Sequence, residues 1–185
     1  HCETISEYNN LYQEYPLRNQ RLDYFLNAWY GVILNRLVSL GFSQKHSLLD
    51  YGCGTGLFVK FLRQKGYNNC VGYDPHVKLY NQAQVLTNQY DFVLSLDVIE
   101  HDLDPKSFIQ RLIDRLNPGG HLCLETPNAE GIILANAEEH IHALHLPYHI
   151  HLITPNALKD ICRNKGLHQK VIYKKWYMNS WLPGT

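Results

Sequence analysis

Apolar residues recur along this chain at two different spacings, and the changes between them predict where helices and strands lie. From Leu17 to Leu40 they fall three or four positions apart, as on one face of a helix, and Gly41 follows as a stop. Beyond it, short uninterrupted apolar runs alternate with helical spacing. The strands predicted from those runs are 47–50, 70–74, 92–96, 121–125 and 168–173. The helices predicted between them begin near Leu57, Pro75, Asp104 and Thr154.

Strand and helix alternate from residue 47 onward, which is typical of βαβ units. We therefore predict an α/β, Rossmann-like fold: a mostly parallel sheet with helices on both faces, preceded by an N-terminal helical segment. A chain of 185 residues is long enough for one domain with a full core and too short for two of ordinary size. The expected organisation is one domain, 1–185, in which residues 1–45 form a helical segment or lid and residues 46–185 form the cofactor-binding core.

A glycine loop follows the first predicted strand. Asp50 is followed by Gly52, Gly54 and Gly56, and glycines at alternate positions let the backbone turn sharply and approach a ligand closely. Asp74, at the end of the next predicted strand, lies 18 positions after Gly56, about the spacing at which a carboxylate meets ribose hydroxyls in nucleoside-binding βαβ units. The loop and the acid together predict a nucleoside site beyond the carboxyl ends of the strands.

Two other nucleotide sites fit this loop less well. The dinucleotide fingerprint G-x-G-x-x-G/A puts its third small residue at Leu57 when counted from Gly52, or at Val59 when counted from Gly54. A large side chain there obstructs strand–helix packing and the approach of a pyrophosphate, so a nicotinamide-dependent oxidoreductase is the weaker alternative. No Gly-Lys-Ser/Thr follows the loop, which excludes a P-loop.

Four segments, in order, resemble the motifs of class I S-adenosylmethionine-dependent methyltransferases. They are 48–56 (LLDYGCGTG), 72–74 (GYD), 90–101 (YDFVLSLDVIEH) and 116–120 (LNPGG), and the similarity covers roughly 48–166. The version with Val-Ile-Glu-His is similar to that of ubiquinone-pathway and other small-molecule methyltransferases. The resemblance implies S-adenosylmethionine as the cofactor and methyl transfer as the activity.

The same resemblance implies a role for individual residues. The loop would line the methionine end of the cofactor, with Asp50 fixing the loop or meeting the methionyl amine through water. Asp74 would accept both ribose hydroxyls, and the two residues just past strand 92–96 would form the wall beside the sulfonium. The implied cofactor-binding residues are Asp50, Gly52, Cys53, Gly54, Gly56, Asp74, Asp97 and Val98.

The chain departs from the family between its second and third motifs. Only 16 residues separate Asp74 from Asp91, where the family usually fits a helix, a third strand with an adenine-contacting acid, and a further helix. We expect the third strand to be short or missing, and no adenine-contacting acid is assigned.

Three histidines are candidates for catalysis. Methyl transfer from a sulfonium is an in-line displacement, so most of the catalysis is positioning, but a hydroxyl acceptor also gains about 10²–10⁴-fold from a general base. His101 follows strand 92–96, and His149 and His151 lie before the Thr154 helix, in a stretch that in similar enzymes folds over the acceptor. The alternative for each is an ordinary packing or surface role.

A run of histidines raises the question of a metal. Five of them fall within twelve residues, accompanied by Glu138 and Glu139: His140, His142, His145, His149 and His151. A structural zinc site needs four ligands, and no H-E-x-x-H or C-x₂-C frame accompanies this run. We therefore predict no bound metal.

Charge and cysteine content narrow the partners. Lys+Arg and Asp+Glu are 17 each, and a formal net charge of zero argues against a nucleic-acid partner. No apolar stretch is long enough to span a membrane and no secretory leader is visible. Five scattered cysteines without a CxxC pair favour a reducing compartment, the cytoplasm. The expected partner is a small-molecule acceptor, with a hydroxyl favoured over an amine or carbon, and the oligomeric state is left open.

The sequence also leaves a further class of protein open. A non-catalytic cofactor-binding or protein-interaction domain could keep this fold without a working acceptor site, because function depends on the site rather than on the fold. Detection of methyl transfer, as opposed to cofactor binding alone, separates the two classes.

Overall fold

The computed structural model describes residues 23–140, 144–145 and 147–173, and the chain divides into two compact units. The first unit comprises His1–Leu96 and Arg111–Leu124, and the second comprises Asp97–Gln110 and Glu125–Thr185. Among the described residues, no helix is both long and apolar enough to cross a membrane.

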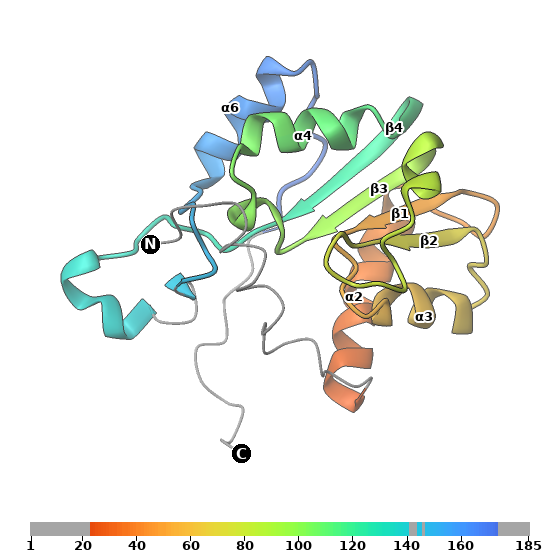
Figure 1. Cartoon of the computed structure of the whole chain (residues 1–185), viewed down its shortest axis with the longest axis horizontal. Helices are drawn as coiled ribbons and strands as arrows, with labels where there is room; N and C mark the ends of the chain where they lie inside the picture. Colours follow the sequence, from red (N-terminus) through yellow and green to blue (C-terminus); the bar gives the residue numbers. More distant parts are fainter. Residues whose placement is uncertain (1–22, 141–143, 146, 174–185) are drawn as a thin grey trace. The chain divides into compact units, whose positions relative to one another are not determined.

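The first unit is built on a four-stranded sheet in the order β2-β1-β3-β4 (Figure 1). The strands are β1 (Leu48–Tyr51), β2 (Cys70–Tyr73), β3 (Tyr90–Leu96) and β4 (Leu116–Glu125). β1 runs parallel to both of its neighbours, with Leu48 opposite Cys70 on one side and Phe92 on the other. Tyr90 N donates to Arg115 O and Asp97 N donates to Glu125 O, so β4 advances in the same direction as β3. The predicted parallel sheet and α/β class are confirmed.

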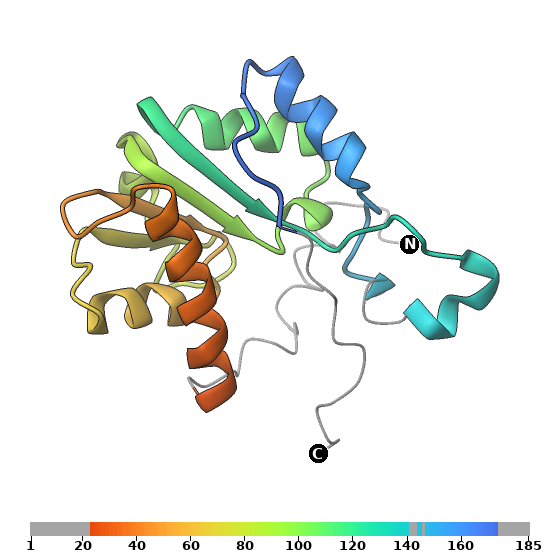
Figure 2. The ribbon, with the colours of Figure 1, turned by 180° about the vertical axis from the view of Figure 1, so that it is seen from behind.

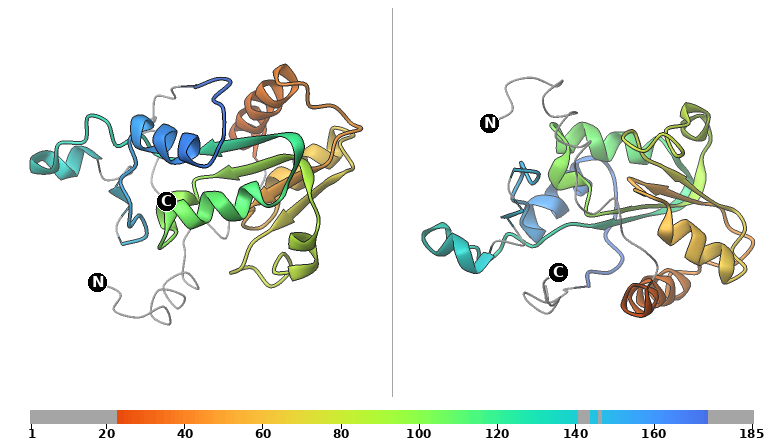
Figure 3. Two further views of the ribbon diagram at one scale, coloured as in Figure 1. Left: turned by 90° about the horizontal axis from the view of Figure 1, so that it is seen from above. Right: turned by 60° about the horizontal axis from the view of Figure 1, so that its bottom comes forward.

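Helices α2 (Tyr24–Ser39) and α3 (Leu57–Gln64) lie on the same side of this sheet (Figure 2; Figure 3, right). Ile33 and Leu37 of α2 are buried in one cluster with Phe58 of α3 and the apolar residues of β1 and β3. The Tyr30 ring packs 5.1 Å from that of Phe58, centroid to centroid. Burial of large apolar side chains stabilises by roughly 1.5–3 kcal/mol each, so α2 is a packing helix of the core. The rest of the predicted N-terminal segment, 1–22, lies outside the described residues.

The second unit carries η3 (Ile99–His101), η4 (Leu134–His140) and α6 (Pro155–Asn164), while α4 (Pro105–Ile113) begins in it and ends in the first. The helix starts predicted at Asp104 and Thr154 are confirmed by their caps. Asp104 Oδ1 accepts from the backbone N–H groups of Lys106 and Ser107, and Thr154 Oγ1 accepts from Ala157 N. Gly166, with φ +79°, follows the end of α6 as expected.

The helix predicted after Pro75 is wrong. Asp74 N donates to Tyr80 O, and Asn81 Nδ2 donates to Pro75 O, so the chain folds back on itself as a loop before the short η2 (Ala83–Thr87). These contacts use the local polar groups that a helix would need for its own ladder. The segment 74–89, all of it described, contains no strand, which confirms the expectation that the family's third strand is short or missing here.

Two further differences between the predicted and the observed elements concern strands. Residues 168–173 form no strand, and the side chains of Val171, Ile172 and Tyr173 are about half exposed, so the apolar pattern there is not buried against a sheet. β4 begins at Leu116 rather than at His121. A Cβ at Gly120 would lie 3.0 Å from Asp91 O, so glycine lets the chain approach β3 several residues earlier than the pattern indicated.

Candidate functional site

The glycine loop joins β1 to α3 in a conformation that requires glycine. Gly52, Gly54 and Gly56 have φ values of +84°, +53° and +73°, in the left-handed region that other residues rarely adopt. Gly52 N and Cys53 N both donate to Tyr73 O, at 2.7 and 3.1 Å. These bonds hold the loop against the carboxyl end of β2, and they bring it to the acid that follows.

Asp74 closes the loop from that side. Its Oδ2 accepts from Gly54 N at 2.9 Å and its Oδ1 accepts from His76 N at 2.8 Å. A carboxylate has about four lone-pair positions, so two remain for further donors such as ribose hydroxyls. A Cβ built on Gly54 would meet nothing within 4 Å, which leaves open space beside the loop. These residues fit the S-adenosylmethionine that the resemblance implies.

Asp50 lies beneath the loop and is only 4% exposed. Burial, and secondarily the charge of Asp74, raise the pKa of Asp50 to about 7. Its register partner on β2 is Gly72, where a Cβ would lie 2.6 Å from Cys53 Sγ. Cys53 therefore packs into the space that Gly72 leaves. Burial also raises the pKa of the Cys53 thiol well above its usual value, which keeps it protonated and unreactive.

Tyr80 is a residue of this site that the sequence did not reveal. A Cβ at Gly56 would collide with the Tyr80 ring, so the ring lies directly against the loop. Tyr80 also lines a pocket with Val59 and Arg63 of α3. It comes from the shortened connection between β2 and β3, which carries no periodic pattern that could have identified it.

The other two cofactor candidates belong to the second unit. Asp97 is exposed and has φ +51°, and its N–H donates to Glu125 O at 2.9 Å. Val98 is partly buried and precedes η3. The structure places both directly after β3, as expected.

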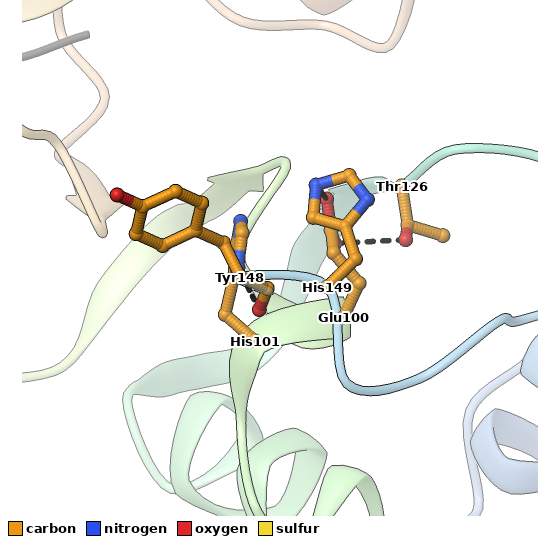
Figure 4. A network of polar contacts seen from close by, with 5 residues as sticks. All are labelled: Glu100, His101, Thr126, Tyr148 and His149. Atoms are coloured by element: carbon orange, nitrogen blue, oxygen red, sulfur yellow. Dashed lines mark hydrogen bonds and ion pairs between the residues drawn. The ribbon is translucent and has the colours of Figure 1, made fainter. Parts of the chain in front are cut away.

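Glu100, His101 and His149, which we call the Glu-His cluster, come together in the second unit (Figure 4). Glu100 is 1% exposed, and its Oε2 accepts from the Thr126 hydroxyl at 2.8 Å. Its other oxygen, Oε1, lies 3.8 Å from His149 Nε2. Burial, and after it the charge of Asp97, raise the pKa of Glu100 to about 8.

His101 is buried, and one of its ring nitrogens forms a hydrogen bond. Its Nδ1 lies 2.9 Å from Tyr148 O, and because a carbonyl can only accept, this nitrogen carries the proton. Nε2 is therefore the nitrogen that carries the lone pair in neutral His101. Burial, more than any other cause, lowers the pKa of His101 to about 4, so the ring is neutral near pH 7. The His101 and His149 ring centroids lie 4.7 Å apart.

The third predicted histidine, His151, lies in the same segment. The backbone N–H groups of Ile150 and His151 both donate to Glu100 O, at 3.0 and 3.1 Å, which fastens this segment to η3. Among the described residues, His151 Nε2 is buried and has no hydrogen-bond partner. The structure thus brings all three predicted histidines into one unit.

Sequence reasoning missed Glu100, Thr126 and Tyr148 as members of this site. Glu100 had a signal, because it immediately precedes His101 at the end of a strand. Thr126 and Tyr148 had none, because each contributes one contact across many residues of sequence. Of the histidine run, His142 lies outside the described residues, and His145 stacks edge-on to His149 with centroids 5.1 Å apart.

Known proteins are similar to this chain in sequence and in fold. A family model described as a methyltransferase domain matches residues 19–169. A ubiquinone biosynthesis O-methyltransferase of Ruegeria pomeroyi is 30% identical over 149 residues, covering 65% of this chain and 59% of that protein. A tRNA U34 carboxymethyltransferase of Alteromonas mediterranea is 30% identical over 111 residues, covering 46% of this chain and 33% of that protein. The chain thus spans between a third and three fifths of the length of these relatives.

Solved structures show the same fold at lower identity. The magnesium protoporphyrin IX methyltransferase of Synechocystis, solved with S-adenosylhomocysteine, is 16% identical with a TM-score of 0.55, covering 88% of this chain and 84% of that one. A SAM-dependent methyltransferase of Archaeoglobus fulgidus is 20% identical with a TM-score of 0.52, covering 78% and 74%.

Proposed function

Because this chain belongs to the family of methyltransferase domains, we propose that it transfers a methyl group from S-adenosylmethionine to a hydroxyl of a small molecule. The predicted family, fold class, enzyme class and cofactor are confirmed. The family match runs through both compact units, which supports the proposal that they act as one domain.

The observation that carries the hydroxyl acceptor is the unpartnered ring nitrogen of His151. Buried polar atoms almost always have a hydrogen-bond partner, and leaving one without costs about 1–3 kcal/mol. A hydroxyl bound at His151 Nε2 would supply that partner, and the imidazole could then take its proton. Amine and activated-carbon acceptors rely more on positioning and give such a base less to do.

The surrounding contacts suit a positioned base. The bond from His151 N to Glu100 O holds the backbone of this residue to η3. Glu100 is in turn oriented by Thr126, and the neighbouring His101 by Tyr148 O. In this proposal the glycine loop and Asp74 bind the cofactor, while His151 removes the acceptor proton as the methyl group is transferred.

The acceptor is proposed to be a small molecule rather than a nucleic acid. The name of one relative specifies an O-methyltransferase and that of another specifies tRNA, so the relatives support either. A formal net charge of zero favours the small molecule, because phosphate contacts usually require a basic excess. The free thiols of Cys53, Cys70, Cys123 and Cys162 support a reducing compartment such as the cytoplasm.

The test combines binding and transfer. Calorimetry should find that S-adenosylmethionine and S-adenosylhomocysteine bind more tightly than NAD, and tighter NAD binding would overturn the cofactor assignment. Methyl-labelled cofactor is then offered with panels of phenols, alcohols, amines and tRNA. Label on a hydroxyl is expected. Label on amines or RNA alone would overturn the proposed acceptor, and binding without transfer to any acceptor would favour the non-catalytic alternative.

Variants test the base at saturating cofactor in single-turnover reactions. His151→Ala should lower the rate about 10²–10⁴-fold while cofactor affinity stays nearly unchanged. His168→Ala, at an exposed histidine after α6, is the matched control and should keep the wild-type rate. A His151→Ala protein as fast as the control would remove His151 from the mechanism.

A further inference from the structure

The Glu-His cluster has the donor set of a metal centre. We propose that Glu100, His101 and His149 bind a divalent transition-metal ion of the zinc type and leave one coordination position open. All three side chains lie within one compact unit, so this site does not depend on how the two units are arranged. No metal was predicted from the sequence because the histidine run within 138–151 has no zinc-binding frame, whereas two of these three ligands come from η3.

The three ligand atoms are somewhat farther apart than the ligand atoms of a zinc site. One ligand atom from each side chain lies within 4.8 Å of the other two, and Glu100 Oε1 is 3.8 Å from His149 Nε2. With zinc–ligand bonds of about 2.0–2.1 Å in a tetrahedron, two ligand atoms stand roughly 3.4 Å apart. The Glu100–His149 separation exceeds this by about 0.4 Å and the 4.8 Å limit exceeds it by about 1.4 Å, so side-chain movements of roughly 0.5–1 Å each would close the site around an ion.

The Glu100 carboxylate has one oxygen available to a metal ion and one held by a hydrogen bond. Its Oε1 is buried and has no hydrogen-bond partner among the described residues, while its Oε2 is held by the Thr126 hydroxyl. A buried carboxylate oxygen without a donor is costly, and a cation beside it removes that cost. Thr126 then has the orienting role that hydroxyl partners of ligating carboxylates commonly have.

His101 is oriented in the same way. Ligating histidines usually donate their other ring N–H to a carbonyl or carboxylate, which fixes the tautomer and aims the free lone pair at the metal. His101 donates from Nδ1 to Tyr148 O, so Nε2 is the ligating nitrogen. Tyr148 directly precedes His149, so one turn of chain supplies both the orienting carbonyl and the next ligand.

The ligand types select the metal. Two imidazoles and one carboxylate suit Zn²⁺ and Fe²⁺, whereas Mg²⁺ and Ca²⁺ prefer oxygen ligands. Three protein ligands with an open fourth position are the pattern of catalytic rather than structural zinc sites. An acceptor hydroxyl bound there would lose its proton more readily; that consequence, unlike metal binding itself, rests on the proposed function.

The experiment uses the purified protein stripped with a chelator and then titrated with ZnCl₂ in a calorimeter. One zinc ion per chain is expected, and Glu100→Gln or His149→Ala should weaken its binding at least 100-fold. Thr126→Val, which removes only the orienting hydroxyl, should weaken it about 10–100-fold. His168→Ala is the control and should bind zinc normally. Zinc binding that is absent, or equally strong in the ligand variants, would overturn the proposal.

Two further measurements cover the remaining outcomes. Co²⁺ bound to the wild-type protein should show visible ligand-field bands without a thiolate charge-transfer band, which tests the ligand set even where a variant fails to fold. A thiolate band would assign the ion to cysteine and overturn the site. Cofactor binding and methyl transfer are then measured in parallel. Intact transfer without zinc binding would remove the metal site alone, and zinc binding without transfer to any acceptor would remove the proposed function alone.

Discussion

Asp74 accepts a hydrogen bond from the glycine loop and is also the residue expected to bind the ribose. Replacing it should therefore affect both the stability of the protein and its affinity for the cofactor, and the two effects can be measured separately. Asp74→Ala removes the acceptor for both Gly54 N and His76 N, which lie 2.9 and 2.8 Å from the carboxylate. Hydrogen bonds to a charged group contribute about 1.5–3 kcal/mol each, but Asp74 is only partly buried, so water replaces much of the loss. We expect the free energy of unfolding to fall by about 1–3 kcal/mol in total.

Asp74→Ala should also weaken the binding of the cofactor. If the two remaining acceptor positions of Asp74 bind ribose hydroxyls, their removal costs at least about 1.4 kcal/mol, a tenfold weaker Kd. Asp74→Asn keeps one side-chain acceptor oxygen and should lie between the wild type and Asp74→Ala in both properties. Calorimetry with S-adenosylhomocysteine measures the affinity, and urea unfolding measures the stability.

The control is Asp160→Ala on α6, where the side chain is 64% exposed and, within the part of the chain that the structure describes, forms an ion pair with Arg163. Such a pair contributes little, so neither affinity nor stability should change measurably. A folded Asp74→Ala protein that binds S-adenosylhomocysteine within twofold of the wild type would refute the assignment of Asp74 to the ribose.

Three further predictions concern the first unit. The pKa of Asp50 is about 7 in the folded protein and 3.8 in the unfolded reference, so folding favours the protonated form and stability falls as pH rises from about 4 through about 7. Between pH 5 and 7 the free energy of unfolding of the wild type should fall by about 2–3 kcal/mol relative to that of Asp50→Asn, as measured by urea unfolding. Parallel pH profiles of the two proteins would contradict this. Gly72→Ala places a Cβ 2.6 Å from Cys53 Sγ and should lower the free energy of unfolding by about 1–3 kcal/mol. Adding Cys53→Ala should restore part of this loss. Gly31→Ala, whose Cβ would meet nothing within 4 Å, is the control and should not lower the free energy of unfolding. Asp91→Ala removes the acceptor for Ser47 N, the Ser47 hydroxyl and Asn117 Nδ2, and should lower the free energy of unfolding by about 2–4 kcal/mol; a change below about 0.5 kcal/mol would show that these bonds contribute no net stability.

The sequence was most informative where structure depends on neighbouring residues. Apolar spacing located the parallel strands, and the Thr154 and Asp104 caps located two helix starts, because periodicity and capping are local properties. The glycine loop was also predictable, since positive φ at alternate positions requires glycine. The same local rules failed after Pro75, where side-chain and backbone contacts within the loop replace a helix, and at 168–173, where an apolar pattern does not enter the sheet.

Only the tertiary structure decided which distant side chains meet. Tyr80 lies against Gly56, and His149 lies 3.8 Å from Glu100 across 49 positions of sequence. Neither contact leaves a periodic or capping signal, because each depends on how a loop returns to a strand end. The sequence by itself therefore determined the parallel strands, the loop and its paired acid. The partners of the histidines, and with them the protonation state of His101 and the environment of Glu100, depend on burial and on hydrogen bonds that form only when the chain is folded.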